Sequence, residues 1–292
     1  MLVTWSFRQR NSLMEKIDPR ARWIFSLLFL FSITLFWDLR ILLVFFVLAF
    51  TWYLSARTTW RETRRGWLFI LLILMSMVVV NTIITSGGTS GIVAQEGQHP
   101  IWGFTLTLPI TGWMIHFTLT IERVWFALAQ IVRILSISAV FLIIPYSMDP
   151  RLYGFTFHGL GLPDRFAYSM DLAFRYVPTL ARDFITTLDA QKARGYEIER
   201  VEGGLIRQVR RIAPLIVPVT MGSILTGEDV INAMDLRCFG LQKRTWVTIT
   251  TFHWYDFGLI IFSVLLLLGS LIIRYVFDIG AFWVPEWLLG MF

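Results

Sequence analysis

The sequence has few of the residues that build catalytic or metal sites. Cysteine occurs once, as Cys238, and no His-Glu-x-x-His, Gly-x-Ser-x-Gly or Gly-x-x-x-x-Gly-Lys-Ser/Thr motif is present. The four histidines lie in separate regions, as His99, His116, His158 and His253. These absences argue against hydrolysis or metal binding by this chain alone. A single cysteine also excludes an intramolecular disulfide, and we expect Cys238 to be a small, reduced and buried side chain.

Charged residues are scarce as well. They make up only 16% of the chain, whereas 56% of its residues are hydrophobic and the mean hydropathy is +0.64. A soluble domain of 292 residues cannot hide that much apolar surface in one core. The composition therefore predicts an integral membrane protein. Its net charge of +6 fits basic residues that flank apolar spans better than it fits nucleic-acid binding.

Five apolar stretches are close to the length that crosses about 30 Å of hydrocarbon, and they predict an all-α fold with about five transmembrane helices. They are residues 20–37, 41–56, 67–85, 117–146 and 256–277. Only residues 38–40 separate the first two, so this pair either crosses fully as a tight hairpin or enters and returns. The first stretch has no small-residue cleavage site, and we expect it to remain as an anchor.

The distribution of basic residues predicts the orientation of these spans. With a cytoplasmic N-terminus, segments 1–22, 57–66 and 147–246 carry 5, 4 and 13 Lys or Arg, which is 22 of the 26 in the chain. That asymmetry places the N-terminus inside and the C-terminus outside. We therefore expect three regions: 1–146 with four spans, 147–246 at or near the cytoplasmic surface, and 247–292 with the last span and an outer tail.

Ionisable residues are rare within the predicted spans. The paired carboxylates that a proton relay needs are missing, and Glu122 lies near a surface. Arg133 falls near mid-depth, where an unpaired charge costs several kcal/mol, so we expect it to face protein or a cavity. We favour a structural anchor, with a role in a substrate path as the alternative. Outside the membrane, residues 86–116 predict a loop followed by a small hairpin strand, to which we assign no chemistry.

Two long helical patterns occupy the region 147–246. The first follows a turn at 158–164, repeats apolar residues every three or four positions, and ends at Gly195. Its apolar stripe consists of Phe166, Met170, Phe174, Val177, Leu180, Phe184 and Leu188. The second runs from Leu205 to Arg237, with bends expected at Pro214 and Pro218. Its part 212–219, which includes Ile212 and Ile216, is apolar on nearly all sides and is expected to lie against the bilayer or another membrane subunit.

A weak internal repeat joins the two patterns. Asp-Ala-Gln-Lys-Ala-Arg-Gly-Tyr-Glu at 189–197 recurs 43 residues later as Asn-Ala-Met-Asp-Leu-Arg-Cys-Phe-Gly at 232–240. Both copies place an arginine, Arg194 or Arg237, near a helix end. Each arginine could simply stabilise its own helix end, where a cation is favoured by up to about 1 kcal/mol. The matched contexts favour a second interpretation, in which each guanidinium binds a carboxylate in an acidic groove of a partner that comes in two similar copies.

These segments resemble the transmembrane T component of energy-coupling factor transporters, the EcfT and CbiQ-like family. The resemblance is strongest between about Arg133 and Thr245, and Asp18-Pro19-Arg20 before the first span is similar to the family pattern too. The matching blocks are Gly161-Leu162-Pro163, Ala173-Phe174-Arg175-Tyr176-Val177-Pro178, Ala190-Gln191-Lys192-Ala193-Arg194-Gly195, Pro214-Leu215-Ile216-Val217-Pro218, Ala233-Met234-Asp235-Leu236-Arg237 and Arg244-Thr245.

The resemblance implies a multi-pass protein of a prokaryotic plasma membrane with no catalysis of its own. It would join two cytoplasmic ABC-type ATPases, a homodimer or a heterodimer that binds ATP and Mg, to a small membrane substrate-binding S component. The residues implied in ATPase docking are Ala193, Arg194, Gly195, Leu236, Arg237 and Cys238. The apolar stripe, together with Ile212 and Ile216, would support the S component. ATP-driven movement of these long cytoplasmic coupling helices would topple the S component and carry a vitamin or metal ion inward.

Two alternatives accompany this interpretation. Within the same class, the chain would be a T component dedicated to cobalt or nickel. In another class, it would be a stand-alone secondary transporter or a membrane enzyme, for which inverted repeats with intramembrane acids or clustered nucleophiles and ligands would be expected, and neither pattern is present. The second motif departs from the family pattern, because Leu236 and Cys238 stand where small residues usually flank the arginine. That departure implies a different fit at the second docking site.

Overall fold

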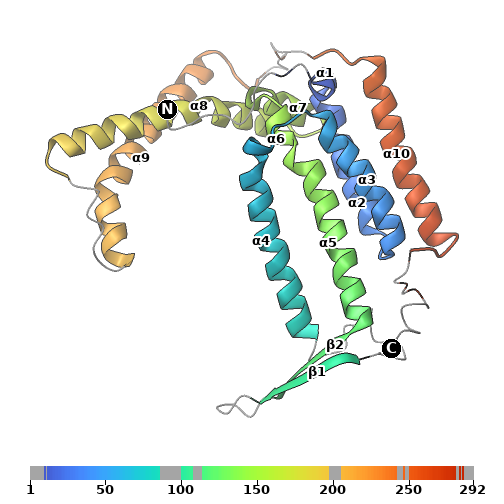
Figure 1. Ribbon diagram of the computed structural model, residues 1–292. Coiled ribbons are helices and arrows are strands. Elements are labelled where there is room, and N and C mark those ends of the chain that lie inside the picture. The colour runs from blue at the N-terminus through green and yellow to red at the C-terminus, as the bar shows by residue number, and fades with distance from the viewer. Residues whose placement is uncertain are drawn as a thin grey trace. The chain divides into compact units, whose positions relative to one another are not determined.

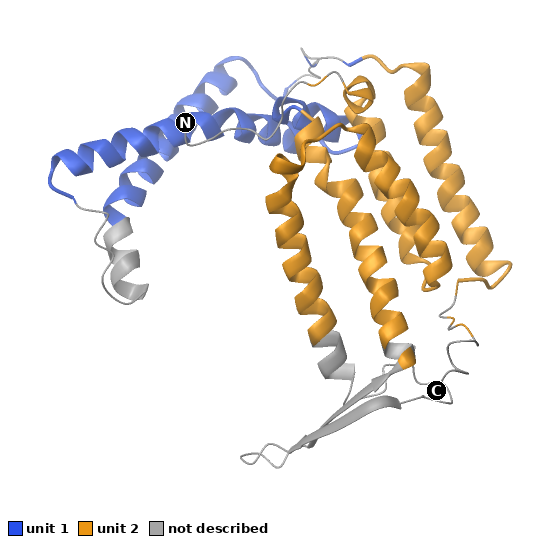
Figure 2. Cartoon of the chain, viewed as in Figure 1, with its two compact units in different colours: residues 1–5, 149–250 blue, residues 6–148, 251–292 orange. Residues whose placement is uncertain are grey.

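The computed structural model describes residues 10, 12–85, 100–107, 114–196, 205–241, 246, 250–280, 283 and 285. Nearly all of this part of the chain is helical, and it also contains a two-stranded antiparallel sheet (Figure 1). The chain divides into two compact units, which Figure 2 distinguishes by colour. Unit 1 comprises residues 1–5 and 149–250, and unit 2 comprises residues 6–148 and 251–292.

Unit 2 holds the helices that correspond to the five predicted spans. Its elements are α1 (Leu13–Lys16), α2 (Pro19–Thr34), α3 (Leu39–Ser55), α4 (Trp60–Thr85), β1 (Pro100–Thr107), β2 (Met114–Thr120), α5 (Ile121–Leu142), α6 (Ile144–Ser147) and α10 (Trp254–Tyr275). The predicted start of the fourth span at residue 117 was wrong, because β2 continues to Thr120. The alternation of threonine with apolar residues suits a strand, and Phe117 pairs with Phe104 of β1.

Aspartate caps set the starts of α2 and α3. The Asp18 carboxylate accepts a hydrogen bond from the Arg20 backbone N–H at 2.8 Å, with Pro19 at the first helical position, which confirms the predicted helix start. Asp38 does the same for Arg40 at 3.0 Å. Each of these two helices thus has a capped start. At 1.5 Å per residue each is about 25 Å long, slightly less than a hydrocarbon core of about 30 Å.

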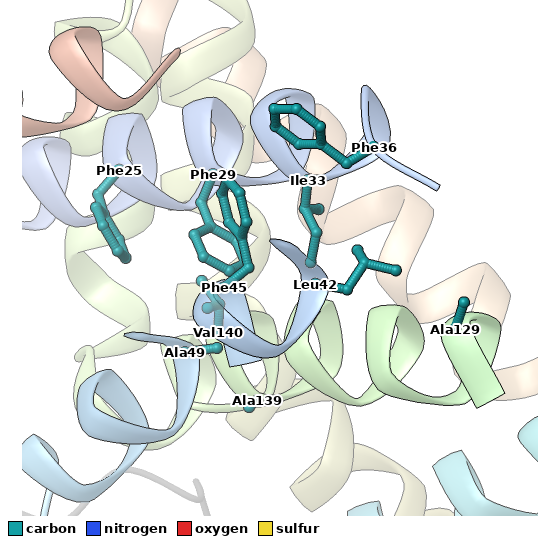
Figure 3. Close-up of a cluster of buried hydrophobic side chains, with 10 residues drawn as sticks. All are labelled: Phe25, Phe29, Ile33, Phe36, Leu42, Phe45, Ala49, Ala129, Ala139 and Val140. Atoms are coloured by element: carbon teal, nitrogen blue, oxygen red, sulfur yellow. The ribbon is translucent and has the colours of Figure 1, made fainter. Parts of the chain in front are cut away.

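Aromatic packing joins α2, α3 and α5 into the core of unit 2. The ring centroids of Phe29 and Phe45 lie 5.5 Å apart with their edges toward faces. Figure 3 shows the ten buried side chains of this cluster, Phe25, Phe29, Ile33, Phe36, Leu42, Phe45, Ala49, Ala129, Ala139 and Val140. In this cluster α2 contributes the large rings of Phe25 and Phe29, whereas α3 and α5 contribute small alanines as well.

Polar contacts tie helix ends together at one side of unit 2. The Asp18 backbone N–H donates to the Asp256 carboxylate of α10 at 2.8 Å, and the Asp256 side chain is fully buried. The Tyr146 hydroxyl donates to the Glu62 carbonyl at 3.3 Å. The starts of α2 and α10 therefore lie together, and α6, which directly follows α5, lies beside the start of α4. This arrangement is the one that spans of alternating direction require.

Arg133 of α5 lies at the opposite end of α2. It is 8% exposed, and its guanidinium donates to the Phe36 carbonyl and lies 4.0 Å from the centre of the Trp37 ring. Another nitrogen of the same guanidinium donates to the Gln130 side-chain carbonyl at 3.4 Å. The Trp37 ring and the Phe36 carbonyl thus stabilise the Arg133 charge, as a carboxylate partner would in an ion pair. These are the contacts of a structural anchor between α5 and α2.

Three described stretches are long and apolar enough to cross a membrane. They are Val124–Ser147, Ala213–Leu236 and Trp254–Tyr275, and Leu39–Ser55 is a shorter apolar helix. The stretch Ala213–Leu236 was not among the predicted spans, and only 6% of it is buried within the chain. Together with the composition, these helices make the chain an all-α integral membrane protein.

Unit 1 contains the two long helices that the sequence patterns predict. Its elements are the short 3-10 helix η1 (Pro150–Leu152), α7 (Tyr153–Gly159), α8 (Asp164–Ala193) and α9 (Leu205–Leu236). The turn before α8 uses Gly161 in the left-handed region, at φ 97°. α7 packs closely on α8 at Gly154, where a Cβ would lie 2.7 Å from the Ala167 carbonyl oxygen.

Candidate functional site

α8 and α9 end in the same backbone hydrogen-bond pattern. At the end of α8, the Gly195 N–H donates to the Lys192 carbonyl at 2.9 Å, and the Tyr196 N–H donates to the Gln191 carbonyl at 3.0 Å. At the end of α9, the corresponding bonds are Cys238 to Asp235 at 2.9 Å and Phe239 to Met234 at 3.0 Å. Both are Schellman motifs. In both, the arginine is the residue just before the left-handed one.

The left-handed position differs in chemistry between the two ends. Gly195 adopts φ 83° without a side chain to strain, whereas Cys238 adopts φ 55° with one. Cys238 is also exposed, so the expectation that it is buried was wrong. The repeat is therefore a repeat of backbone geometry, with cysteine in the glycine position.

We call residues 193–195 and 236–238 the arginine ends. All six side-chain positions are exposed, and Leu236 is 87% exposed. The carbonyls of Gln191 and Lys192 already accept backbone N–H groups. Within the described part of the chain, no hydrogen bond or ion pair of the Arg194 side chain is recorded. The guanidinium of Arg194 is thus available to an acceptor on another molecule.

The arginine ends lie at opposite ends of an antiparallel helix pair. Near the end of α8, the Gln191 side chain reaches the Pro214 carbonyl of α9 at 3.5 Å. Near the start of α8, the Tyr168 ring lies 4.6 Å from the ring of Phe239. Arg237 therefore lies beside the start of α8, whereas Arg194 lies at its end. The rise of 1.5 Å per residue places the two arginines about 40 Å apart along the pair.

The predicted apolar stripe on α8 is only partly exposed. Phe166, Val177 and Leu180 are 54%, 36% and 37% exposed, and Ile216 of α9 is 53% exposed. Met170, Phe174, Phe184 and Leu188 are half-buried, and Phe174 stacks on Tyr153 at 5.0 Å within the same unit. The Ile212 side chain lies outside the described residues. The exposed members remain the candidates for contact with another membrane subunit.

Sequence reasoning missed the residues that fix the end of α9. The Tyr168–Phe239 ring contact anchors the chain directly after the Schellman turn, at the position where hydrophobic contacts commonly accompany this motif. The available signal was the aromatic residue that follows the left-handed position in both copies of the repeat, Tyr196 and Phe239. It identified an aromatic position but not its partner on α8.

Comparisons with known proteins identify chains of similar sequence. The chain is similar to the energy-coupling factor transporter transmembrane protein EcfT of Lactobacillus helveticus, at 24% identity over 90% of this chain and 91% of that protein. It is 26% identical to EcfT of Streptococcus equi subsp. equi, over 91% of this chain and 94% of that one. An 86-residue stretch is also 34% identical to a putative ABC transporter ATP-binding protein of Bifidobacterium longum, covering 29% of this chain and 11% of that protein.

The family match covers most of the chain. A model of the CbiQ family, described as cobalt transport protein, matches residues 11–247. The matched region includes the spans up to α5, both long helices of unit 1 and both arginine ends. The chain belongs to the CbiQ cobalt transport protein family.

Proposed function

We propose that the chain is the coupling subunit of an energy-coupling factor importer in a prokaryotic plasma membrane. It transmits the ATP-driven movement of two cytoplasmic ABC-type ATPases to a membrane substrate-binding component. The observation that carries this proposal is the pair of matching helix ends, each with an exposed arginine at the same place in a Schellman turn. Two arginine ends with the same backbone geometry are suited to a partner that has two similar subunits.

The geometry of the arginine ends supports docking onto a pair. A separation of about 40 Å along the helices is on the scale of one small domain, so each end can reach a different ATPase subunit. A guanidinium binds a carboxylate with two parallel hydrogen bonds, which fixes orientation as well as position. The similarity of 86 residues to a putative ABC transporter ATP-binding protein supports an association with such ATPases.

The long helices explain how force could be transmitted. α8 has 30 residues and α9 has 32, and each continues through proline, at Pro178 in α8 and at Pro214 and Pro218 in α9. Closure of the ATPases on ATP and Mg changes the distance between their docking grooves. Because each arginine sits at the end of one continuous helix, that change moves α8 relative to α9. The substrate-binding component rests on the exposed apolar residues Phe166, Val177, Leu180 and Ile216, and it follows this movement.

Co-purification tests the proposal. The tagged chain is expected to retain both ATPase subunits when it is purified from its membranes, whereas Arg194→Glu and Arg237→Glu are each expected to lose them. Arg182→Glu is the matched control, because Arg182 is exposed on the same helix but away from its end. Equal expression and membrane insertion must be established for every variant. Retention of the ATPases by both arginine-end variants contradicts the proposal.

The family description favours a second candidate function in the same class. The matching family is described as cobalt transport protein, which points to a coupling subunit dedicated to cobalt or nickel. Cells that carry the complete transporter distinguish the two, through ATP-dependent uptake of radioactive Co²⁺ or Ni²⁺ measured against uptake of vitamins. Metal uptake that depends on Arg194 supports the dedicated form, and vitamin uptake that depends on Arg194 supports the general one.

A further inference from the structure

The exposed face of α4 changes from cationic to apolar along its length. Arg61, Arg64 and Arg65 are exposed in the first two turns. Residues at the same angular position, three or four apart, then continue the face: Leu68, Leu72, Met75 and Val79 are 65%, 65%, 57% and 52% exposed. One side of this helix thus presents three positive charges followed by a strip of aliphatic side chains.

The opposite face of α4 is occupied by the rest of unit 2. Thr63 is fully buried and shares a hydrogen bond with the Tyr53 hydroxyl at 2.9 Å. A Cβ at Gly66 would lie 2.7 Å from a methyl group of Leu142 on α5, and Leu74 is 6% exposed. The orientation of α4 is therefore fixed by packing, and the arginine face points away from the protein.

Within the part of the chain that the structure describes, the charges of the three arginines are not balanced by a carboxylate. Glu62 is the acidic residue of the first turn, and it is engaged by Arg10 at 2.6 Å and by the Thr59 hydroxyl at 2.7 Å. Among the described residues, no ion pair or hydrogen bond of the Arg61, Arg64 or Arg65 side chains is recorded. The start of a helix is its positive end, so cations are disfavoured there. An anionic partner would remove this penalty.

We propose that this face of α4 binds an anionic phospholipid. Its phosphate group lies among Arg61, Arg64 and Arg65, and its acyl chains lie along Leu68, Leu72, Met75 and Val79. The distance from Leu68 to Val79 is about 16 Å at 1.5 Å per residue, which matches one leaflet, half of a hydrocarbon core of about 30 Å. The arginine end is the predicted cytoplasmic end, where anionic lipids attract basic residues. Trp60, at 67% exposure, sits at the level where aromatic side chains favour the interface.

The basic residues that orient a span need only lie on the correct side of the membrane. In α4 three of them lie within two turns on the exposed side of one helix, so they also offer several charged donors to one phosphate group at the start of the exposed apolar surface. Bound lipid would also hold α4 at a fixed depth in the membrane, since the rest of unit 2 contacts only one face of this helix.

Native mass spectrometry of the full chain in a mild detergent tests the proposal. Phosphatidylglycerol and phosphatidylcholine with the same acyl chains are added at equal concentration. The wild-type chain is expected to retain phosphatidylglycerol preferentially. R61Q/R64Q/R65Q is expected to lose about 100-fold in affinity for it, about fivefold for each arginine, and R64Q alone about fivefold. R61K/R64K/R65K keeps the charge and is expected to retain most of the binding.

The matched control is R165Q/R175Q/R182Q, which removes three exposed arginines from α8. Equal retention of the two lipids by the wild type, unchanged binding by the α4 glutamine variants, or an equal loss in the α8 control overturns the proposal. If R61Q/R64Q/R65Q keeps its lipid but loses a co-purifying membrane protein, the face is a protein-docking surface and the lipid proposal is wrong. The R64Q and lysine variants decide the matter if the triple glutamine variant does not fold.

Discussion

Gly195 and Cys238 occupy equivalent left-handed positions at the ends of α8 and α9, with φ of 83° and 55°. The two residues are 43 positions apart, and each N–H donates to the carbonyl three residues earlier at 2.9 Å. The two copies of the internal repeat therefore form the same backbone turn, once after α8 and once after α9. The two turns differ in strain, because only glycine adopts this backbone conformation without cost.

Exchanging the residues at these positions should have opposite effects on stability. Cys238→Gly is expected to raise the free energy of unfolding by about 1 kcal/mol, because it removes a Cβ from a left-handed residue. Gly195→Ala is expected to lower it by about the same amount, and nothing lies within 4 Å of the added Cβ, so the effect is one of backbone alone. Thermal unfolding of the purified chain measures both.

Gly222→Ala provides the control for this comparison. Gly222 lies within α9, and nothing lies within 4 Å of its Cβ position either. Alanine there should stabilise the helix by about 0.5–1 kcal/mol. A stabilised Gly195→Ala would show that the left-handed turn does not persist in solution.

The exposed thiol of Cys238 reports directly on occupancy of the second arginine end. It is the one cysteine in the chain, so a maleimide probe labels a single site. Labelling of the isolated chain is expected to be rapid, and the purified ATPase pair should slow it in proportion to the bound fraction. Cys238→Ser combined with Asp278→Cys is the control, since the Asp278 side chain is 93% exposed and lies in unit 2. Equal protection of both cysteines would point to nonspecific shielding.

The buried carboxylate of Asp256 should be important for assembly of the membrane helices. One oxygen accepts the Asp18 backbone N–H and the other accepts the His253 N–H, both at 2.8 Å. Asparagine offers one acceptor in place of two, so Asp256→Asn is expected to lose about 1.5–3 kcal/mol of stability. Asp278→Asn should change the melting temperature little. An Asp256→Asn melting temperature equal to that of the wild type would contradict the importance of this link between α2 and α10.

Arg133 should not be replaceable by lysine. Its planar guanidinium lies over Trp37 while it donates to Phe36 and Gln130, and an ammonium group cannot satisfy these directions together. Arg133→Lys is therefore expected to lower the melting temperature, by a loss of about 1–2 kcal/mol. Arg274→Lys, in a half-exposed ion pair at 3.9 Å with Asp278, is the comparison and should have a smaller effect. Equal effects would mean that charge alone is needed at Arg133.

The long apolar and amphipathic patterns were predictable because they depend on local spacing. The stripe from Phe166 to Leu188 predicted α8, and Asp18 followed by Pro19 predicted the start of α2. The start of α5 was misplaced by four residues, since an apolar run alone does not tell a strand from a helix. Cross-strand pairing with β1 decided that boundary.

Contacts between distant residues could not be predicted from spacing. Arg133 and Phe36 are 97 residues apart, and Asp18 and Asp256 are 238 apart, so no local pattern links them. At the candidate site, the repeat placed both arginines near helix ends, where the structure has them, but it did not reveal that the two ends share one backbone turn. It did not reveal that Cys238 is exposed, because burial depends on where the chain turns after the last helical residue. The contact between Tyr168 and Phe239 was missed for the same reason.

The affinity of the purified ATPase pair for the chain in lipid nanodiscs tests the central claim most directly. Arg194→Glu and Arg237→Glu should each weaken binding by about 2–5 kcal/mol, which is roughly 30-fold or more, and Arg182→Glu should leave it within about threefold. The double variant should bind no more tightly than either single variant. ATPase affinities for Arg194→Glu and Arg237→Glu that equal the wild-type value would contradict the assignment of the two helix ends as docking sites.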